Sequence, residues 1–371
     1  MKITDIQTVV VNAQRERTWL FVEVHTDEGV VGIGEASQNR LDAGAVAQIR
    51  ELAPLYIGRS PLDVIGERSL LLRRPDAHRM LFSAVSGIEQ ALWDLCGKAL
   101  GVPCYQLLGG AVRDRIRLYA NIVLAAINRS PEEYAELAKR AALEGFTAVK
   151  LNPIDPVLPR SRLPGSDEFK RLADLAVERV RAVREAVGPT VDVLTDWSYA
   201  VPPSEARRLA ERMAEFHLFW IEEPFWSADP SLLAEFRRGL GTRLAGGEMS
   251  SGLVPFRRLL EAKAVDVLMV DVKWIGGILE ARKVSAMAEA YETEIGPHNM
   301  SGPVATAASV QLCATLPNFL ILEYCWGAVP WRADLVEGTE RVEKGFIPLP
   351  TTPGLGISWN SQAAREYRYQ P

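Results

Sequence analysis

Three carboxylate residues recur at an even spacing in the middle of the sequence. Asp196, Glu222 and Glu248 each follow a short apolar run, and each step between them is 26 residues. A step of that size covers about one strand, one helix and their loops, so we expect the three carboxylates at the same end of adjacent parallel strands. Unit charges about 4 Å apart repel by ~4 kcal/mol at an effective dielectric of about 20. A divalent cation relieves this repulsion, and oxygen ligands favour Mg²⁺, with one ion per site.

The series continues on the neighbouring apolar runs. Asp271 ends the next run, and His298 ends the one after it, 27 residues later. An aspartate that binds one ring nitrogen of a histidine fixes its tautomer and raises the basicity of the other nitrogen, which is typical of a general base. Lys150 ends an earlier run and Glu323 lies near the end of the last one. We call the following set the strand-end ring: Lys150, Asp196, Glu222, Glu248, Asp271, His298 and Glu323.

A Mg²⁺ site opposite a histidine base suits the removal of a proton α to a carboxylate. The resulting enediolate carries two negative charges on oxygen, which a divalent cation and Lys150 stabilise. Each residue alone has a structural interpretation: a helix cap or ion pair for an aspartate, a satisfied core histidine for His298, a surface lysine for Lys150. Their shared position at strand ends favours the functional interpretation.

Regular alternation of apolar runs and amphipathic helices begins near residue 116. The strands and helices that it predicts must hold the strand-end ring in place. It predicts a parallel sheet with helical crossovers, and eight runs suit a closed (β/α)₈-type barrel better than an open sheet. No G-x-G-x-x-G dinucleotide turn is present. The runs are 116–122, 148–151, 191–195, 218–221, 244–247, 265–270, 295–297 and 319–322.

The first hundred residues have a different pattern. A strand hairpin is expected over 18–33, followed by helices over 41–55 and 86–100, which together indicate an α+β unit. The tail carries Pro and Gly turns and is expected to return to this unit. We therefore expect a capping domain over 1–113, a catalytic barrel over 114–333 and a returning segment over 334–371. The proline-rich insertion 153–165 is expected to follow the second barrel strand, on the face of the active-site loops.

Composition excludes several classes of function. The formal net charge of −5 argues against a nucleic-acid groove or an anionic membrane surface. No apolar run approaches the ~20 residues that span a bilayer. The four scattered cysteines fit buried thiols in a reducing cytoplasm, so a cytoplasmic location is expected. Only four histidines are present, which leaves His298 as the one histidine of the strand-end ring.

These residues carry a resemblance to the enolase superfamily, mandelate racemase subgroup, over essentially the whole chain. SGIEQALWDLCGK at 86–98 and LLGG at 107–110 resemble its capping-domain signature, and WIEEP at 220–224 and GGE at 246–248 resemble its metal motifs. The resemblance implies a (β/α)7β modified TIM barrel under an N-terminal α+β capping domain. It also implies Mg²⁺ on the three acids of the central spacing and the Asp271–His298 pair as base. The sister muconate-lactonizing subgroup has a lysine base where Asp271 stands, and Lys273 is not at that position.

Within the subgroup, the second strand separates two activities. Racemases carry Lys-x-Lys there, but this chain has Lys150-Leu151-Asn152, and Asn152 cannot serve as a second base. Lys-x-Asn resembles galactonate-dehydratase-like acid-sugar dehydratases, as do PHNMSGP at 297–303 and PGLG at 353–356. These enzymes also carry a histidine acid two residues after the first metal ligand. Ser198 stands at that place, so His298 returns its proton to the leaving group, or Tyr199 or another group donates it.

The leading hypothesis is a Mg²⁺-dependent dehydratase of a sugar acid, an aldonate or an aldarate, that forms a 2-keto-3-deoxy acid. The alternatives are a racemase, epimerase or cycloisomerase on a related hydroxy acid, and a non-catalytic sugar-acid sensor. A small-molecule substrate and a homo-oligomer are expected, without nucleic acid or membrane partners. Arginines of the cap near residues 12–18 and 73–79 have two interpretations: they meet a distal carboxylate of the substrate, or they are solvated surface side chains. The candidate substrate-binding residues are Asn152, Arg15, Arg17, Trp197, Ser198 and Tyr199.

Overall fold

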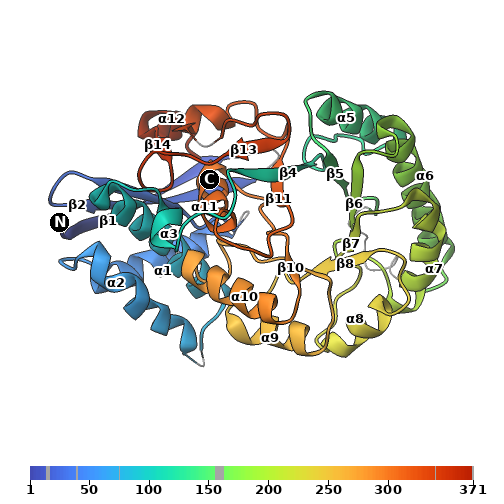
Figure 1. Cartoon of the computed structure of the whole chain (residues 1–371), viewed down its shortest axis with the longest axis horizontal. Helices are drawn as coiled ribbons and strands as arrows, with labels where there is room; N and C mark the ends of the chain where they lie inside the picture. The colour runs from blue at the N-terminus through green and yellow to red at the C-terminus, as the bar shows by residue number, and fades with distance from the viewer. Residues whose placement is uncertain (14–16, 39–40, 75, 155–162, 339, 370–371) are drawn as a thin grey trace.

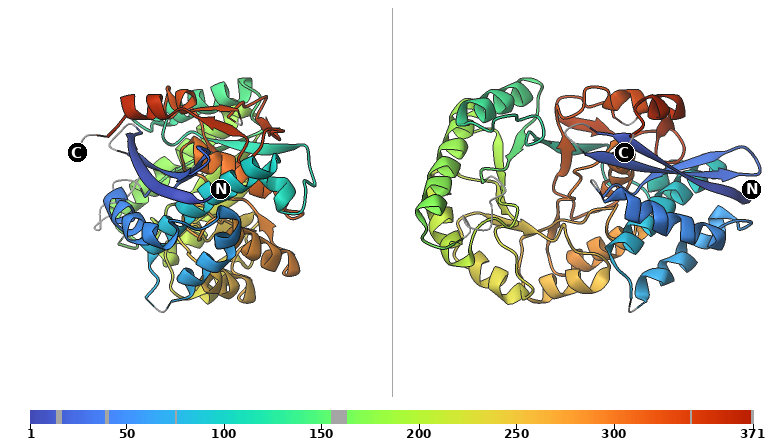
Figure 2. Two further views of the ribbon diagram at one scale, coloured as in Figure 1. Left: turned by 90° about the vertical axis from the view of Figure 1, so that its left-hand side faces the viewer. Right: turned by 180° about the vertical axis from the view of Figure 1, so that it is seen from behind.

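The chain is divided between a capping domain and a barrel, which lie at the left and right of Figure 1. The computed structural model describes all residues except 14–16, 39–40, 75, 155–162, 339 and 370–371. Both chain ends lie on the side of the capping domain (Figures 1 and 2). Among the described residues, no helix is both long enough and apolar enough to cross a membrane.

The capping domain combines a small sheet with helices. Its strands are antiparallel in the order β1-β2-β3, and the expected hairpin is formed by β2 and β3. The long helix begins at Arg79 rather than at residue 86, because His78 caps its first turn through Nδ1 and the buried residues 81–85, mostly apolar, extend its buried face. The elements are β1 (Ile3–Asn12), β2 (Thr18–Thr26), β3 (Val31–Glu35), α1 (Asp42–Leu52), η1 (Ala53–Leu55), α2 (Pro61–Arg68), η2 (Ser69–Arg73), α3 (Arg79–Leu100) and α4 (Cys104–Leu107).

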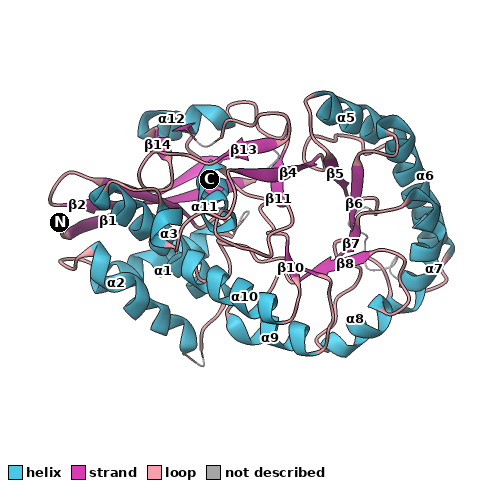
Figure 3. Cartoon of the chain, viewed as in Figure 1, coloured by secondary structure: helices cyan, strands magenta, loops and turns pink. Residues whose placement is uncertain are grey.

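The second part of the molecule is a (β/α)7β barrel, with strands inside and helices outside (Figure 3). Its parallel strands follow the order β10-β9-β8-β7-β6-β5-β4-β11, and a parallel bridge between Ile295 and Phe319 closes the circle. The strands are β4 (Arg115–Asn121), β5 (Ala148–Leu151), β6 (Asp192–Asp196), β7 (Trp220–Glu222), β8 (Arg243–Gly246), β9 (Val267–Leu268), β10 (Glu294–Ile295) and β11 (Leu322–Cys325). The helices are α5 (Pro131–Leu143), α6 (Asp167–Val187), α7 (Pro203–Met213), η4 (Ala214–Phe216), α8 (Pro230–Arg237), α9 (Leu253–Glu261), α10 (Ile278–Ala290) and α11 (Pro303–Cys313).

The last barrel strand is displaced from its expected place. The apolar run 319–322 predicts a strand that Glu323 follows, but β11 covers Leu322–Cys325 and contains Glu323. The cause is a change of partner, because Phe319 bridges to Ile295 while residues 322–325 pair with β4. The run itself therefore closes the barrel, and the strand begins where the chain reaches β4.

The C-terminal segment contacts both parts of the molecule. β13 (Phe346–Pro348) pairs with β4 of the barrel, and the backbone of Tyr369 donates to Val10 in β1 of the cap. Leu355 N donates to the Asp94 carboxylate of α3 at 2.9 Å. The remaining elements are η5 (Arg332–Leu335), β12 (Val336–Gly338), β14 (Ile357–Trp359) and α12 (Ser361–Glu366).

Two buried glutamates of the cap hold the first turns of barrel helices. Glu35 accepts from the backbone N–H groups of Gly302 and Ala305 at 2.8 and 2.9 Å at the start of α11. Glu89 of α3 does the same for Ile278 and Leu279 at the start of α10, at 2.8 and 2.9 Å. These N–H groups have no partner within their own helices, and a carboxylate there also complements the helix dipole. Glu35 and Glu89 thus form an interdomain clamp, and Glu89 belongs to the signature segment at 86–98.

This clamp predicts a pH dependence of stability. Burial raises the pKa of Glu89 from 4.5 to about 7, although its backbone N–H donors oppose the change. The folded state therefore binds more protons than the unfolded state between these values, so the contribution of Glu89 falls as pH rises from 4.5 to 7, by about 3 kcal/mol. Chemical denaturation at pH 5 to 8 should show a steeper loss for the wild type than for Glu89→Gln. The exposed Glu136→Gln on α5 should keep the wild-type slope; a Glu89→Gln slope equal to that of the wild type would refute the assignment.

Candidate active site

The barrel interior explains why the strand-end ring exists. One apolar layer fills the barrel, and side chains on a strand alternate between its two faces, so the residue two positions later also points inward. Lys150, Asp196, Glu222, Asp271 and Glu323 each lie two residues beyond a member of this layer. The layer consists of Tyr119, Ala148, Leu194, Trp220, Ala245, Val267, Met269 and Ile321.

The same rule places His298 and selects a residue that sequence reasoning missed, whereas Glu248 lies one position beyond the residue that the rule selects. A Cβ on Gly296 would meet interior side chains of Val267 and Trp220, so His298, two residues later, also points inward. On β8 the inward position falls on Gly247, whose φ of 112° turns the chain before Glu248. On β4, two residues beyond Tyr119, lies Asn121, which the sequence analysis did not select.

His298 and Asp271 form the expected pair. Nδ1 of His298 lies 2.7 Å from Asp271 Oδ2, while Nε2 faces Glu248 Oε2 at 3.6 Å and Glu323 Oε2 at 3.8 Å. Lys273 adds a contact that was not expected, since its Nζ donates to the same Asp271 oxygen at 2.5 Å. Burial alone would raise the pKa of Asp271, but Lys273 and His298 lower it to about 2. Asp271, ionised at neutral pH, therefore orients the ring and leaves Nε2 toward the barrel centre.

Lys150 connects two carboxylates across the barrel. Its Nζ lies 2.7 Å from both Glu222 Oε1 and Glu323 Oε1, and all three side chains are buried. Although burial alone would lower the pKa of Lys150, the two carboxylates raise it well above its ordinary value. Glu323 is held further by Asn121 Nδ2 and by the backbone N–H of Asn299, both at 2.7 Å. This end of the ring is a fixed charge network centred on one ammonium group.

Removing that ammonium group should destabilise the fold. Lys150→Met leaves Glu222 and Glu323 buried and without their cation, which typically costs about 3–5 kcal/mol. Denaturant unfolding in a chelating buffer measures the difference in the free energy of unfolding. The exposed Lys170, which pairs with Asp167 at 3.0 Å, provides the control Lys170→Met, with an expected loss of less than about 1 kcal/mol. Equal losses for the two variants would contradict the network.

The acid cluster meets some requirements of a metal site and not others. Glu222 pairs with Asp196 in the register of β6 and β7, so these two carboxylates stand at the same level. Burial, with the nearby carboxylates of Asp196 and Glu323, raises the pKa of Glu222 to about 8 in spite of Lys150. Oε2 of Glu248 is buried and has no hydrogen-bond partner. The donor set of three carboxylates therefore fits a hard divalent cation.

Protein donors occupy part of this cluster. Ser198 donates through N and Oγ to Asp196 at 2.7 and 3.1 Å, and Glu222 accepts from Lys150 and from Trp220 Nε1. Within the described part of the chain, no three His, Cys, Asp or Glu side chains stand ready to hold a metal ion. Glu223, which the sequence analysis did not single out, accepts from Gly247 N at 2.5 Å and so supports the loop that carries Glu248.

The three residues after β6 do not share one environment: Trp197 lies in the core, whereas Ser198 and Tyr199 form a turn near the acid cluster. Trp197 is fully buried in the main core, and its ring faces Phe236 of α8, so it does not lie in the pocket as a substrate-binding residue. The reason is alternation: Asp196 points inward, and the next side chain points to the helical layer. Ser198 and Tyr199 have φ values of 46° and 59°, an uncommon strain that recurs at functional sites. Asn152 Nδ2 donates to Ser198 Oγ at 2.7 Å.

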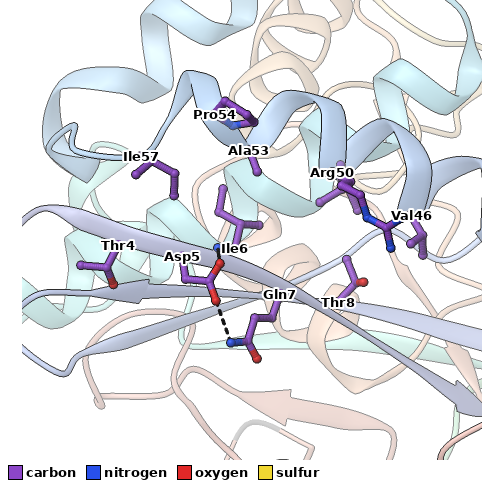
Figure 4. A pocket seen from close by; sticks show the side chains of 11 residues that line it. Thr4, Asp5, Ile6, Gln7, Thr8, Val46, Arg50, Ala53, Pro54 and Ile57 are labelled. Atoms are coloured by element: carbon purple, nitrogen blue, oxygen red, sulfur yellow. Dashed lines mark hydrogen bonds between the residues drawn. The ribbon is translucent and has the colours of Figure 1, made fainter.

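The expected substrate contacts of the cap are only partly described. Arg15 lies outside the described residues, as does most of the insertion 153–165. Arg17 is half-buried beside Met300, with Nη1 4.0 Å from the methionine sulfur. A surface groove of about 840 Å³ between β1 and α1 is lined by residues of the cap alone (Figure 4), and none of these residues belongs to the strand-end ring.

Comparison with known proteins shows the family. Residues 3–109 match the mandelate racemase / muconate lactonizing enzyme N-terminal domain, and residues 133–363 match the enolase C-terminal domain-like model. A D-xylonate dehydratase of Haloferax volcanii is 34% identical over 99% of this chain and 89% of its own length. A D-galactonate dehydratase of Verminephrobacter eiseniae is 33% identical over 99% and 94%.

A solved structure agrees over the full length. The putative mandelate racemase/muconate lactonizing enzyme from Labrenzia alexandrii DFL-11 superimposes with a TM-score of 0.91 and 31% identity, covering 100% of this chain and 96% of that one. Members of this superfamily typically use Mg²⁺. Both parts of the chain match models of one family. The chain therefore belongs to the enolase superfamily, within its mandelate racemase/muconate lactonizing branch.

Proposed function

We propose that the chain is a Mg²⁺-dependent dehydratase of a sugar acid, which removes water from an aldonate or aldarate to give a 2-keto-3-deoxy acid. One observation carries the proposal: the Asp271–His298 pair directs Nε2 toward the centre of the strand-end ring, opposite Lys150. Relatives named as xylonate and galactonate dehydratases, similar over nearly the whole chain, support the same reaction class.

In the proposed reaction, His298 Nε2 accepts the proton from the carbon next to the substrate carboxylate. Nδ1–H stays with Asp271, so the imidazolium that forms is stabilised by an adjacent carboxylate. Lys150 stabilises the negative oxygens of the enediolate. Loss of the β-hydroxyl as water then gives an enol, which tautomerises to the keto acid.

The departing hydroxide needs a proton, and three side chains are candidates for the donor: Ser198, Tyr199 and His298. Ser198 Oγ donates to Asp196 and accepts from Asn152. Burial, with Glu223 and Glu248 beside it, raises the pKa of Tyr199, which makes this phenol a weaker acid than usual. We therefore assign the proton transfer to His298, which returns the abstracted proton to the leaving group in a syn elimination.

Asp196, Glu222 and Glu248 are the residues that would hold the metal ion. When bound, Mg²⁺ would supply Lewis-acid stabilisation of the carboxylate oxygens in the enediolate. The Glu222 carboxylate would then bind both the ion and Lys150, because Lys150 Nζ contacts its Oε1 at 2.7 Å.

Asn152 argues against the isomerase alternative. A two-base inversion needs a second base on the face opposite His298, and an amide that donates to Ser198 cannot accept a proton there. Lys273 lies on the wrong side for this role, because its Nζ is bound to Asp271 behind the imidazole. The expected homo-oligomer and cytoplasmic location stay predictions, as do the domain boundaries at residues 113 and 333.

A screen of aldonates and aldarates with Mg²⁺ tests the proposed function. The expected result is a keto acid that reacts with semicarbazide, from at least one acid of the panel. Tight binding of an acid with neither keto-acid formation nor exchange of its α-proton would instead support a non-catalytic sensor.

A further inference from the structure

Arg79 reaches from the capping domain over the mouth of the barrel. It is the first residue of α3, and its guanidinium lies 4.0 Å from the ring centroid of Trp274. Trp274 in turn faces His298, with ring centroids 5.1 Å apart, and its Nε1 donates to Ser37 O of the cap. The guanidinium is therefore one aromatic ring away from the general base, on the side of the cap.

The polar contacts of Arg79 are made to uncharged groups. Nε donates to Gln38 Oε1 at 3.0 Å, and Nη1 lies 3.3 Å from the sulfur of Met249. No ion pair of Arg79 occurs among the described residues, whereas the buried Arg332 pairs with Glu340 at 2.7 Å. An amide oxygen and a thioether leave most of its five N–H donors unused.

This half-buried charge is held in place without an anion. Stacking on Trp274 and the bond to Gln38 fix the plane of the guanidinium. Burial lowers the pKa of Arg79, while the carboxylates of Asp271 and Glu248 act in the opposite direction from beyond ion-pair distance. An oriented, partly desolvated guanidinium is suited to two parallel hydrogen bonds with a carboxylate.

We propose that Arg79 binds a terminal carboxylate of the substrate, so that the preferred substrates are aldarates, sugar acids with a carboxylate at each end. The inference rests on the proposed function, because it places the reacting carbon at His298. From there, a five- or six-carbon acid extends past Trp274 toward the guanidinium. Arg79 is thereby a specificity residue, and it takes no part in the proton transfer.

Matched pairs of acids test this assignment: D-gluconate with D-glucarate, D-galactonate with galactarate, and D-xylonate with xylarate. The wild type with Mg²⁺ should prefer an aldarate to its matched aldonate in kcat/KM. Arg79→Met should raise KM for that aldarate by about 10- to 100-fold with kcat within about 3-fold, and should leave the aldonate unchanged. Arg79→Lys should recover part of the loss. Arg50→Met, on an exposed arginine of the remote groove in Figure 4, is the control.

Calorimetric binding of the same acids to the wild type and to Arg79→Met separates this inference from the proposed function. The role of Arg79 is overturned if the wild type prefers the aldonate of every pair. It is also overturned if Arg79→Met loses affinity for the aldonate and the aldarate of a pair by the same factor. Keto-acid formation from the aldonates alone overturns it while leaving the dehydratase intact. Absence of keto acid from all six acids counts against the dehydratase, and selective loss of aldarate binding in Arg79→Met would still support the role of Arg79.

Discussion

Replacement of His298 by asparagine is expected to abolish both dehydration and exchange of the substrate α-proton. Asparagine keeps a polar side chain of similar reach beside Asp271 but cannot accept a proton at neutral pH. Since general-base catalysis contributes about 10²–10⁴-fold, and Asn152 cannot accept the proton in its place, kcat should fall by ~10³-fold. Proton exchange in D₂O, followed by NMR, measures the first step independently of water loss.

The chain offers a matched control for this substitution. His217 is exposed and has a φ of 48°, a conformation that asparagine tolerates better than most residues. His217→Asn should keep wild-type rates of exchange and dehydration. Residual exchange in His298→Asn above a tenth of the wild-type rate would show that another group removes the proton.

Glu248→Gln is expected to have opposite effects on stability with and without metal. In the absence of a divalent ion, burial and the neighbouring carboxylates of Asp196 and Glu222 raise the pKa of Glu248 well above its ordinary value. A neutral amide is therefore tolerated at this position, and the melting temperature should stay equal or rise. With Mg²⁺, the wild type should gain stability by mass action, and the variant should gain little because it has lost a ligand. Activity should fall by ~10²-fold or more, since a metal ion supplies several kcal/mol to the transition state.

Thermal unfolding over a Mg²⁺ titration checks this reversal. Glu261→Gln, at an exposed glutamate of α9, is the control and should follow the wild type at every concentration. A Mg²⁺-dependent gain in Glu248→Gln equal to that of the wild type would exclude Glu248 as a ligand.

Spacing was the most informative feature of the sequence. The strand-end ring depends on a register repeated from strand to strand, and repeats of 26 and 27 residues record that register directly. The structure brings His298 to Asp271 and Lys150 to Glu222 and Glu323, contacts that follow from inward alternation above one apolar layer. The same rule, applied to every strand, would also have selected Asn121.

The positions of three other residues could not be predicted from spacing, because they depend on alternation, on a turn and on the start of a helix. The position of Trp197 beside Asp196 predicts a place in the pocket, although alternation directs this side chain into the helical layer. Lys273 was recognised only as displaced from a lysine-base position, and its bond to Asp271 depends on the turn that follows β9. Arg79 reaches the site only because α3 begins earlier than its pattern indicates. Contacts between the cap and the barrel join residues far apart in sequence and leave no periodic signal.

The most direct test of the central claim is an NMR spectrum of an accepted sugar acid after incubation in D₂O with the protein and Mg²⁺. Dehydration through His298 predicts a 2-keto-3-deoxy acid with deuterium at C3 and a product equal in amount to the substrate lost. Recovered substrate of inverted configuration with deuterium on its α-carbon, and no keto acid, would contradict the account and identify an isomerase.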